Sequence, residues 1–350
     1  DAIVIGAATP HAEVAASDVV RGAIPALARL DFVAALPNPA APPYVYFAGS
    51  CLGTAVGGGG VTALEAAGRL AGEAAEVLAL AGNAPKAPGN DGDAELWAVD
   101  LVSGEPTSVP RATVLPGLAQ RPAGNPLCLG LAAGPDRTAA RLAGLLELVE
   151  RDAAARWWND GARPHQPDCA TLAHTAEMLA ALRGPVPRRA TTLLVLDGAA
   201  GISVICALSC GPQGGDLAFG LKAAPDPAVA ARGAVIECLQ MEIALDLARL
   251  RAERGTPAAT DADVLARAGL DTEAYAAFAG CPAEPAALHP GDLDALVARL
   301  AEAGHRPVAV DLPDAPPGFA VARILAPTLL PLPGGAPGRP GTPGAMAGLM

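Results

Sequence analysis

Two glutamates stand inside one of the most apolar stretches of the chain, residues 145–153. Glu147 and Glu150 are three residues apart, a spacing that places two side chains on one stripe of a helix. The leucines and the valine around them would bury most of that helix, so we expect both carboxylates to be drawn inward. A carboxylate in an apolar interior takes up a proton, finds a partner or binds a metal, because an isolated buried charge is very costly. Glu147 and Glu150 are therefore candidates for chemistry.

The same arrangement recurs on two further predicted helices. A capping side chain precedes a glutamate by 11 residues in the pairs Thr62 and Glu73, Asp136 and Glu147, and Asp226 and Glu237. Three residues beyond these glutamates stand Glu76, Glu150 and Gln240. Eleven residues make about three helical turns, a rise of roughly 16 Å, so cap and glutamate lie along nearly the same face. If the helices belong to similar strand–helix units around one centre, the three pairs of side chains would converge there.

A plainer interpretation of a Glu-x-x-Glu step is a solvated helix face. Arg69 would then pair with Glu73, and Arg156 lies near Asp152. Three recurrences at a fixed distance from a cap, inside apolar helices, favour a shared site instead. Carboxylate oxygens suit Mg²⁺, which proteins usually hold with a few carboxylates together with substrate phosphates. The cluster therefore predicts a metal–nucleotide ligand, and Arg151 is placed to contact a phosphate.

Caps and apolar runs predict the elements that position these groups. We expect helices to follow the three caps and to occupy residues 292–303, and strands at residues 95–102, 107–114, 191–196, 201–208, 307–312 and 319–325. Residues 57–60 are all glycine; alone they indicate a flexible turn, and no P-loop, because no Gly-Lys-Ser/Thr follows. The fold class is α/β, of mixed α+β character, with repeated sheet–helix units around an enclosed nucleotide site.

Composition limits the partners. The chain has 350 residues, 51% of them hydrophobic, which is enough for a large core. A net charge of −12 argues against nucleic acid, which requires basic patches. No apolar run is long enough to span a bilayer and no signal peptide is evident, so we expect a cytoplasmic protein without membrane association. The seven cysteines are scattered like reduced thiols, and the five histidines form no metal-binding pair, so oxygen ligands would hold any metal.

Several segments resemble the YcaO family of ATP-dependent enzymes that activate peptide backbone amides. Residues 130–134 read GLAAG, residues 145–153 read LLELVERDA, and Trp157 and Trp158 follow, which is similar to a highly specific pattern of that family. Weaker matches are GEAAE at residues 72–76, the third helix at residues 226–240, and the closing strands from Asp311 to Pro327. Core packing is the more expected role of the two tryptophans.

The resemblance implies roles for the acidic side chains. Glu73, Glu76, Glu147 and Glu150 would hold Mg²⁺ ions that bridge the phosphates of ATP, Arg151 would contact phosphate, and Glu237 with Gln240 would complete the nucleotide site. The family phosphorylates an amide oxygen after attack by a Cys, Ser or Thr side chain, which gives an azoline, or by sulfide, which gives a thioamide. We favour azoline-forming cyclodehydration of a ribosomally made precursor peptide, with thioamide formation beside a TfuA-type partner as the alternative.

The chain also departs from the family pattern at several cationic positions. The glycines at 57–60 lack the family's lysine, Val77 replaces an arginine, Leu129 replaces an asparagine, and Gly233 replaces an arginine four residues before Glu237, with Arg232 one step away. A second hypothesis is therefore a degenerate, non-catalytic subunit that binds peptide or scaffolds a partner. A leader-peptide-binding protein is a candidate partner and a homodimer a candidate assembly. We expect a divergent segment at residues 1–48, a YcaO-like domain at 49–333 and a flexible Gly/Pro-rich tail at 334–350.

Overall fold

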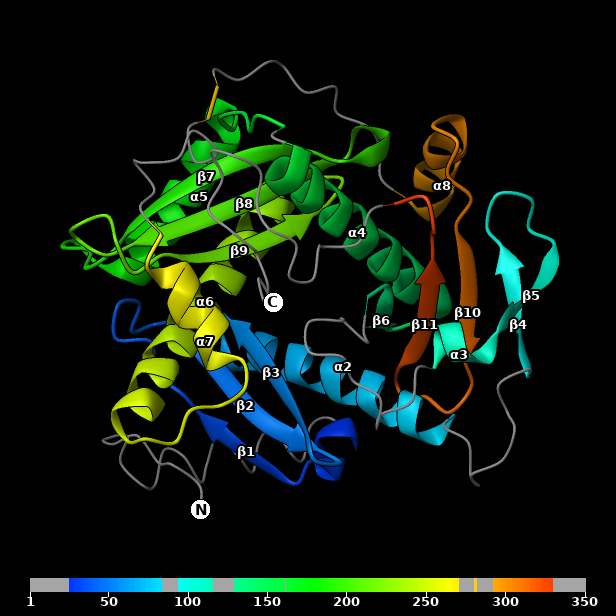
Figure 1. Ribbon diagram of the computed structural model, residues 1–350, viewed down its shortest axis with the longest axis horizontal. Coiled ribbons are helices and arrows are strands. Elements are labelled where there is room, and N and C mark those ends of the chain that lie inside the picture. The colour runs from blue at the N-terminus through cyan, green and yellow to red at the C-terminus, as the bar shows by residue number, and fades with distance from the viewer. Residues whose placement is uncertain are drawn as a thin grey trace.

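The computed structural model of the chain contains three antiparallel sheets, and one strand of each leads into a long helix (Figure 1). The structure describes residues 25–83, 94–115, 129–160, 162–270, 280–281 and 292–329. In Figure 1, β7, β8 and β9 lie at the upper left, β1, β2 and β3 at the lower left, and the remaining sheet at the right. The tail predicted at residues 334–350 lies outside the described residues.

The first sheet has the order β1-β2-β3, with β1 at Phe32–Ala35, β2 at Val45–Cys51 and β3 at Thr54–Gly60. A short 3₁₀ helix, η1 at Pro25–Arg29, precedes it, and α2 at Ala63–Gly82 follows. Strand β2 continues without a break across the boundary expected between residues 48 and 49, and Tyr44 is buried in a core with α6. The described residues before 49 therefore pack together with those after it.

Residues 57–60 form the buried end of β3, so the turn expected there is wrong. The reason is close packing across the strand. A Cβ atom at Gly58 would overlap the backbone of α2 at Ala66 and Leu70, and one at Gly59 would overlap the hydroxyl of Tyr44. Glycine is thus selected by the approach of neighbouring groups, which outweighs its poor intrinsic preference for strands.

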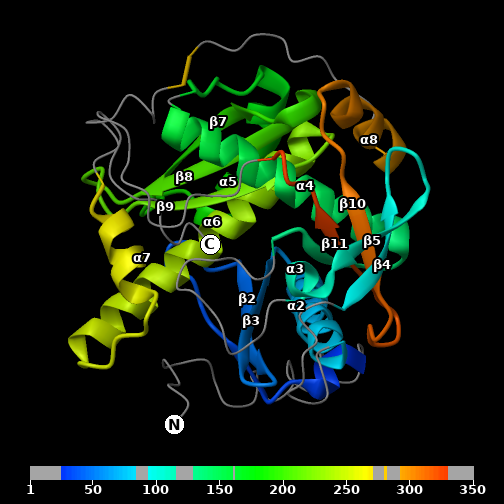
Figure 2. The ribbon, with the colours of Figure 1, turned by 45° about the vertical axis from the view of Figure 1, so that its right-hand side comes forward.

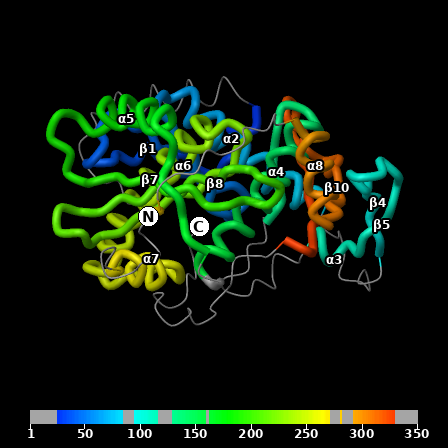
Figure 3. The backbone as a smooth tube through the Cα atoms, turned by 90° about the horizontal axis from the view of Figure 1, so that it is seen from above, coloured from blue at the N-terminus to red at the C-terminus, as the bar shows by residue number. Residues whose placement is uncertain are grey.

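The second sheet has the order β5-β4-β10-β11-β6. Its strands are β4 at Glu95–Asp100, β5 at Pro106–Pro110, β6 at Leu131–Gly134, β10 at Val308–Leu312 and β11 at Ala320–Leu325. Beyond Pro110 the chain turns into a one-turn helix, α3 at Arg111–Val114, where a strand was expected. The β4–β5 hairpin lies at one end of the molecule (Figure 3), and α4 at Arg137–Ala155 follows β6. A π-helical turn, η3 at Arg156–Asp160, continues α4.

The third sheet has the order β7-β8-β9, with β7 at Ala190–Asp197, β8 at Ser203–Cys210 and β9 at Ala218–Ala223. A short 3₁₀ helix, η4 at Ala199–Gly201, joins β7 to β8, and α6 at Pro227–Glu253 follows β9. Three more helices are α5 at Cys169–Arg183, α7 at Asp261–Ala268 and α8 at Leu293–Glu302. Of these three, only α8 was predicted from the sequence. Helix α7 packs beside α6, far from the β4–β5 hairpin (Figure 2).

The three predicted helix caps are confirmed. The Thr62 hydroxyl accepts a hydrogen bond from the Glu65 backbone N–H at 3.2 Å, the Asp136 carboxylate accepts one from Ala139 at 2.8 Å, and Asp226 accepts one from Ala228 at 2.8 Å. Each bond satisfies an N–H group that the first helical turn leaves without a partner. The caps fix where α2, α4 and α6 begin, and therefore which residues lie three turns later.

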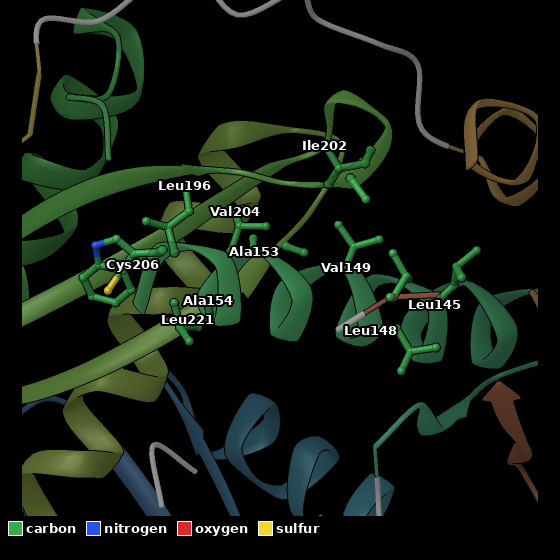
Figure 4. Close-up of a cluster of buried hydrophobic side chains, with 14 of the residues drawn as sticks. Leu145, Leu148, Val149, Ala153, Ala154, Leu196, Ile202, Val204, Cys206 and Leu221 are labelled. Carbon is green, nitrogen blue, oxygen red and sulfur yellow. The ribbon is translucent and has the colours of Figure 1, made fainter. Parts of the chain in front are cut away.

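The apolar side of α4 packs on the third sheet and forms the largest core (Figure 4). Leu145 and Val149 are fully buried there, and Ile202 and Val204 come from the sheet and the loop before it. Trp157 and Trp158 are each 1% exposed in the same core. The expected packing role of the tryptophans is therefore confirmed, and α4 is held rigidly along its apolar face.

A second core, between α5, α6 and the third sheet, encloses a polar network. The carboxylate of Glu242 accepts hydrogen bonds from the guanidinium of Arg183 at 2.6 and 2.9 Å and from Asn38 at 2.9 Å, and the Ser209 hydroxyl also donates to it. Arg183 and Glu242 have side chains only 4% and 3% exposed. The network joins α5 and α6 to the segment before β2.

Among the described residues, no helix is both long and apolar enough to cross a membrane.

Candidate functional site

Each long helix carries a glutamate three turns after its cap, and a backbone amide of the preceding strand segment holds it. The Gly57 N–H donates to Glu73 at 2.6 Å, the Gly130 N–H to Glu147 at 3.1 Å, and the Leu221 N–H to Glu237 at 3.0 Å. The predicted regularity therefore corresponds to a repeated contact between a helix and its own sheet.

The glutamates one step further along reach the next sheet. The Ala133 N–H donates to Glu76 at 3.0 Å, so α2 is joined to β6, and the Ala223 N–H donates to Glu150 at 3.0 Å, so α4 is joined to β9. Helix α6 contacts β3 in turn, which closes a ring of three sheet–helix units. Gln240 has the equivalent place on α6; it is half-buried, and its side chain makes no hydrogen bond with the described part of the chain.

The five carboxylates lie within electrostatic reach of one another. Burial, together with the charges of Glu73 and Glu147, raises the pKa of Glu76 to about 8. Burial also raises the pKa of Glu73 and of Glu237 to about 7, with Glu150 adding to the effect on Glu237. Glu147 has a raised pKa for the same first cause. The ring thus concentrates acidic groups from three helices in one region.

Glu73 keeps solvent-accessible surface, although burial is the main cause of its raised pKa. Protein surrounds its carboxyl group, while part of the side chain still contacts solvent. Glu76, Glu147 and Glu237 are half-buried, and Glu150 is only 3% exposed. The acidic groups therefore combine depth in the protein with access for a ligand.

Arg151 is the buried cation of this region. Its Nη2 atom lies 3.6 Å from Glu147 and 3.7 Å from Glu150, and its Nη1 atom is buried with no hydrogen-bond partner among the described residues. An unsatisfied buried guanidinium N–H is costly, and an anionic oxygen would satisfy it. The predicted role of Arg151 toward phosphate therefore fits its surroundings.

Arg69 and Arg232 form ion pairs at the start of α2, and Arg156 forms one at the end of α4. Arg69 pairs with Glu65 at 2.9 Å, whereas a solvated face would have paired it with Glu73. Arg232 forms a two-pronged pair with the same Glu65, across from α6 to α2. Arg156 pairs with Asp152, as the plainer interpretation expected. Glu73 is thereby left with a backbone partner and no arginine.

Lys222 belongs to this region although its place in the sequence did not indicate it. It is exposed on β9, and its charge lowers the pKa of Glu76, Glu147 and Glu237. A single lysine in a strand forms no recognisable pattern with other residues. Its position four residues before the Asp226 cap is the one feature of the sequence that could have indicated it.

The donor set fits Mg²⁺ shared with phosphate oxygens better than a bare ion. No three acidic, histidine or cysteine side chains within the described ranges are gathered tightly enough to hold a metal alone. Mg²⁺ is usually bound by one or two carboxylates, water and substrate phosphates, so a spread set of glutamates is suitable. Glu73, Glu76, Glu147 and Glu150 are the residues that would hold it.

We expect Mg²⁺–ATP to bind more tightly as pH rises, by about tenfold or more between about pH 6 and pH 8.5, because carboxylates must lose protons to bind metal. The raised pKa values of Glu73, Glu76 and Glu237 set that window. Without bound metal, a carboxyl group whose pKa is raised by folding contributes stability that is complete below its pKa in the unfolded chain. That contribution is lost as the pH rises through the pKa of the same group in the folded protein. Calorimetric titrations in two buffers of different ionisation enthalpy measure the released protons; affinity independent of pH contradicts the expectation.

The chain matches one protein family and shares its fold with several solved structures. A family model described as YcaO cyclodehydratase, ATP- and Mg²⁺-binding, matches residues 58–330. The chain is similar to the structure of YcaO from Methanopyrus kandleri bound with AMPPCP and Mg²⁺, with 22% identity, a TM-score of 0.62, and coverage of 90% of this chain and 91% of that one. No curated protein matches it.

Two other solved structures share the fold. A heterocyclase in complex with substrate and cofactor has 18% identity and a TM-score of 0.66 over 91% of this chain, which spans about half, 52%, of that protein. The E. coli microcin synthetase McbBCD complex has a component with 13% identity and a TM-score of 0.60, with coverage of 84% and 87%. At these identities the likeness establishes the fold, and the repeated sheet–helix architecture expected from the sequence is confirmed.

Proposed function

Since the chain belongs to the YcaO family, we propose that it is an ATP- and Mg²⁺-dependent enzyme that activates backbone amides of a ribosomally made peptide. ATP and Mg²⁺ are the cofactors of this family, as the sequence predicted. The observation that carries the proposal is the set of five glutamates that three helices bring together through backbone contacts, with the Nη1 atom of Arg151, which has no hydrogen-bond partner among the described residues.

When bound, Mg²⁺–ATP supplies the phosphoryl group that converts an amide oxygen into a departing phosphate. The chain's own residues would do the positioning. Glu73, Glu76, Glu147 and Glu150 would ligate the metal, and Arg151 would donate from Nη1 to a phosphate oxygen. Because strand amides already hold all four carboxylates, they need little rearrangement when charge develops. Glu237 and Gln240 would complete the nucleotide site on α6.

We favour azoline formation as the outcome, in which a Cys, Ser or Thr side chain of the substrate attacks the neighbouring carbonyl carbon and the amide oxygen leaves on phosphate. The heterocyclase and the microcin synthetase that share the fold support this choice. A precursor peptide is the substrate, and a leader-peptide-binding protein is the partner that would deliver it. Formation of a thioamide, with sulfide and a TfuA-type partner, is the alternative product.

A scaffold role has one specific observation in its favour. Val77 and Leu129 stand where the family has polar residues, and both pack against hydrophobic cores. Neither position can contribute a contact to phosphate or adenine. A chain that had lost catalysis would show such replacements, whereas the retained carboxylates and Arg151 are what a working site requires.

Incubation with ATP, Mg²⁺ and the precursor peptide encoded beside the gene is expected to release phosphate and to remove one water from the peptide per ring formed. Mass spectrometry distinguishes that loss from the replacement of oxygen by sulfur. The control is the same peptide with its Cys, Ser and Thr residues replaced by Ala. Tight Mg²⁺–ATP binding without phosphate release or peptide modification would instead identify a scaffold.

A further inference from the structure

The first unit, β1–β3 with α2, and the third unit, β7–β9 with α6, each have one cation where the last strand meets the helix, but on opposite partners. Gly58 and Lys222 each stand four residues before the cap of their own unit, and Arg69 and Gly233 each stand seven residues after it. The two units are in the same register, because the strand residue five before each cap donates its N–H to the glutamate eleven after it. The first unit therefore has glycine on the strand and arginine on the helix, and the third unit has the reverse.

The packing explains this exchange. In the first unit, the backbone of α2 lies directly on Gly58, and Arg69 reaches back from the helix to donate to the Gly59 carbonyl at 2.8 Å. In the third unit, the Lys222 side chain crosses α6 at Gly233, where an added Cβ would lie 2.6 Å from Lys222 Cγ. Lysine on the strand thus requires glycine on the helix at that point.

Lys222 stands on β9 between Leu221 and Ala223, whose backbone N–H groups hold Glu237 and Glu150, and it pairs with neither carboxylate. Its charge acts on Glu76, Glu147 and Glu237, which come from all three long helices. It is exposed, and it forms no ion pair with any other residue in the described part of the chain. An ammonium group serving only as a counter-ion would be expected in contact with a carboxylate oxygen. Lys222 is instead free to meet a ligand that enters between them.

We propose that Lys222 binds a phosphate group of the nucleotide, together with Arg151, and so supplies from β9 the cation that α6 lacks at Gly233. The inference rests on the proposed function, since it presumes a nucleotide at the ring of glutamates. A lysine ammonium is a compact charge on a flexible stem and a common partner of phosphate. It also offsets part of the repulsion between the carboxylates and an anionic ligand.

The test is calorimetric titration of the whole chain with a non-hydrolysable Mg²⁺–ATP analogue, Mg²⁺–ADP, Mg²⁺–AMP and Mg²⁺ alone. Lys222→Met keeps the stem and removes the charge, and we expect it to weaken binding of the ATP analogue by about tenfold to a hundredfold, with a smaller loss for AMP. Lys222→Arg is expected to restore part of the affinity. Gly233→Ala, which retains the charge but displaces the stem, is expected to weaken binding less. Arg254→Met, an exposed change of equal charge at the end of α6, is the matched control and should have no effect.

Thermal unfolding of each variant shows whether it is folded. Equal or tighter binding of the ATP analogue by folded Lys222→Met would overturn the inference alone, because Lys222 would then only balance the carboxylates. If Lys222→Met proves unfolded, the affinity of folded Gly233→Ala for the ATP analogue decides instead. Equal or tighter binding by that variant would overturn the inference. Absence of any nucleotide binding by the parent protein would overturn the proposed function as well.

Discussion

Glu147→Gln is expected to weaken Mg²⁺–ATP binding by at least about a hundredfold. The substitution preserves the shape of the side chain, and its amide oxygen still accepts the hydrogen bond from the Gly130 N–H. It removes the negative charge that a hard divalent cation requires, and it leaves Arg151 without one of its two carboxylate neighbours. Titration calorimetry measures the loss, and thermal unfolding should show that Mg²⁺–ATP no longer raises the melting temperature.

Glu177→Gln is the matched control for this experiment. Glu177 is an exposed residue of α5, so the same chemical change there should leave binding unaltered. Glu150→Ala is expected to abolish binding too, since Glu150 lies between α4 and β9 beside Arg151. Unchanged binding by both Glu147→Gln and Glu150→Ala would show that the nucleotide lies elsewhere.

Glu242→Ala is expected to lower the free energy of unfolding by about 3–5 kcal/mol, because it leaves the buried guanidinium of Arg183 uncompensated. Arg183 would lose both of its bonds to the carboxylate, and Asn38 and Ser209 would lose theirs as well. Chemical denaturation with urea measures the change. The large effect follows from the burial of both side chains, since exposed ion pairs contribute little.

The double variant Arg183→Met and Glu242→Met separates the pair from the cost of breaking it. Replacing both charges by apolar side chains of similar size is expected to recover much of the stability, since neither member of the pair is left alone. Arg189 loses its 3.3 Å contact with Glu242 but keeps its hydrogen bonds to Ser209. A single Glu242→Ala variant as stable as the parent would contradict the account of this network. Binding of Mg²⁺–ATP should survive in any folded variant, because the network lies outside the ring of glutamates.

The sequence predicted the parts of the site that depend on local spacing. A cap fixes the first helical turn, so Thr62, Asp136 and Asp226 could be recognised, and the positions of Glu73, Glu147 and Glu237 followed from helical geometry. These side chains were predicted to converge on the assumption that the three helices belong to similar strand–helix units around one centre. The repeated spacing of cap and glutamate suggested that assumption. The ring of helices and sheets is the structural basis of that repeat.

The parts that depend on contacts between distant segments could not be predicted. Residues 57–60 form a strand in which only glycine fits beside Tyr44 and α2. The intrinsic conformational preference of glycine does not predict a strand there. Lys222 becomes part of the site only because Gly233 faces it from α6. Arg69 pairs with Glu65 because the arginine side chain extends back toward β3, where it also donates a hydrogen bond to the Gly59 carbonyl.

The most direct test of the central claim is an experimental structure of the protein with Mg²⁺ and a non-hydrolysable ATP analogue. The triphosphate is expected to lie among α2, α4 and α6, with Mg²⁺ about 2.0–2.1 Å from oxygens of Glu73, Glu76, Glu147 or Glu150 and with phosphate oxygens on Arg151. A nucleotide bound elsewhere, or a triphosphate at this place with no glutamate of the ring on its metal, would contradict it.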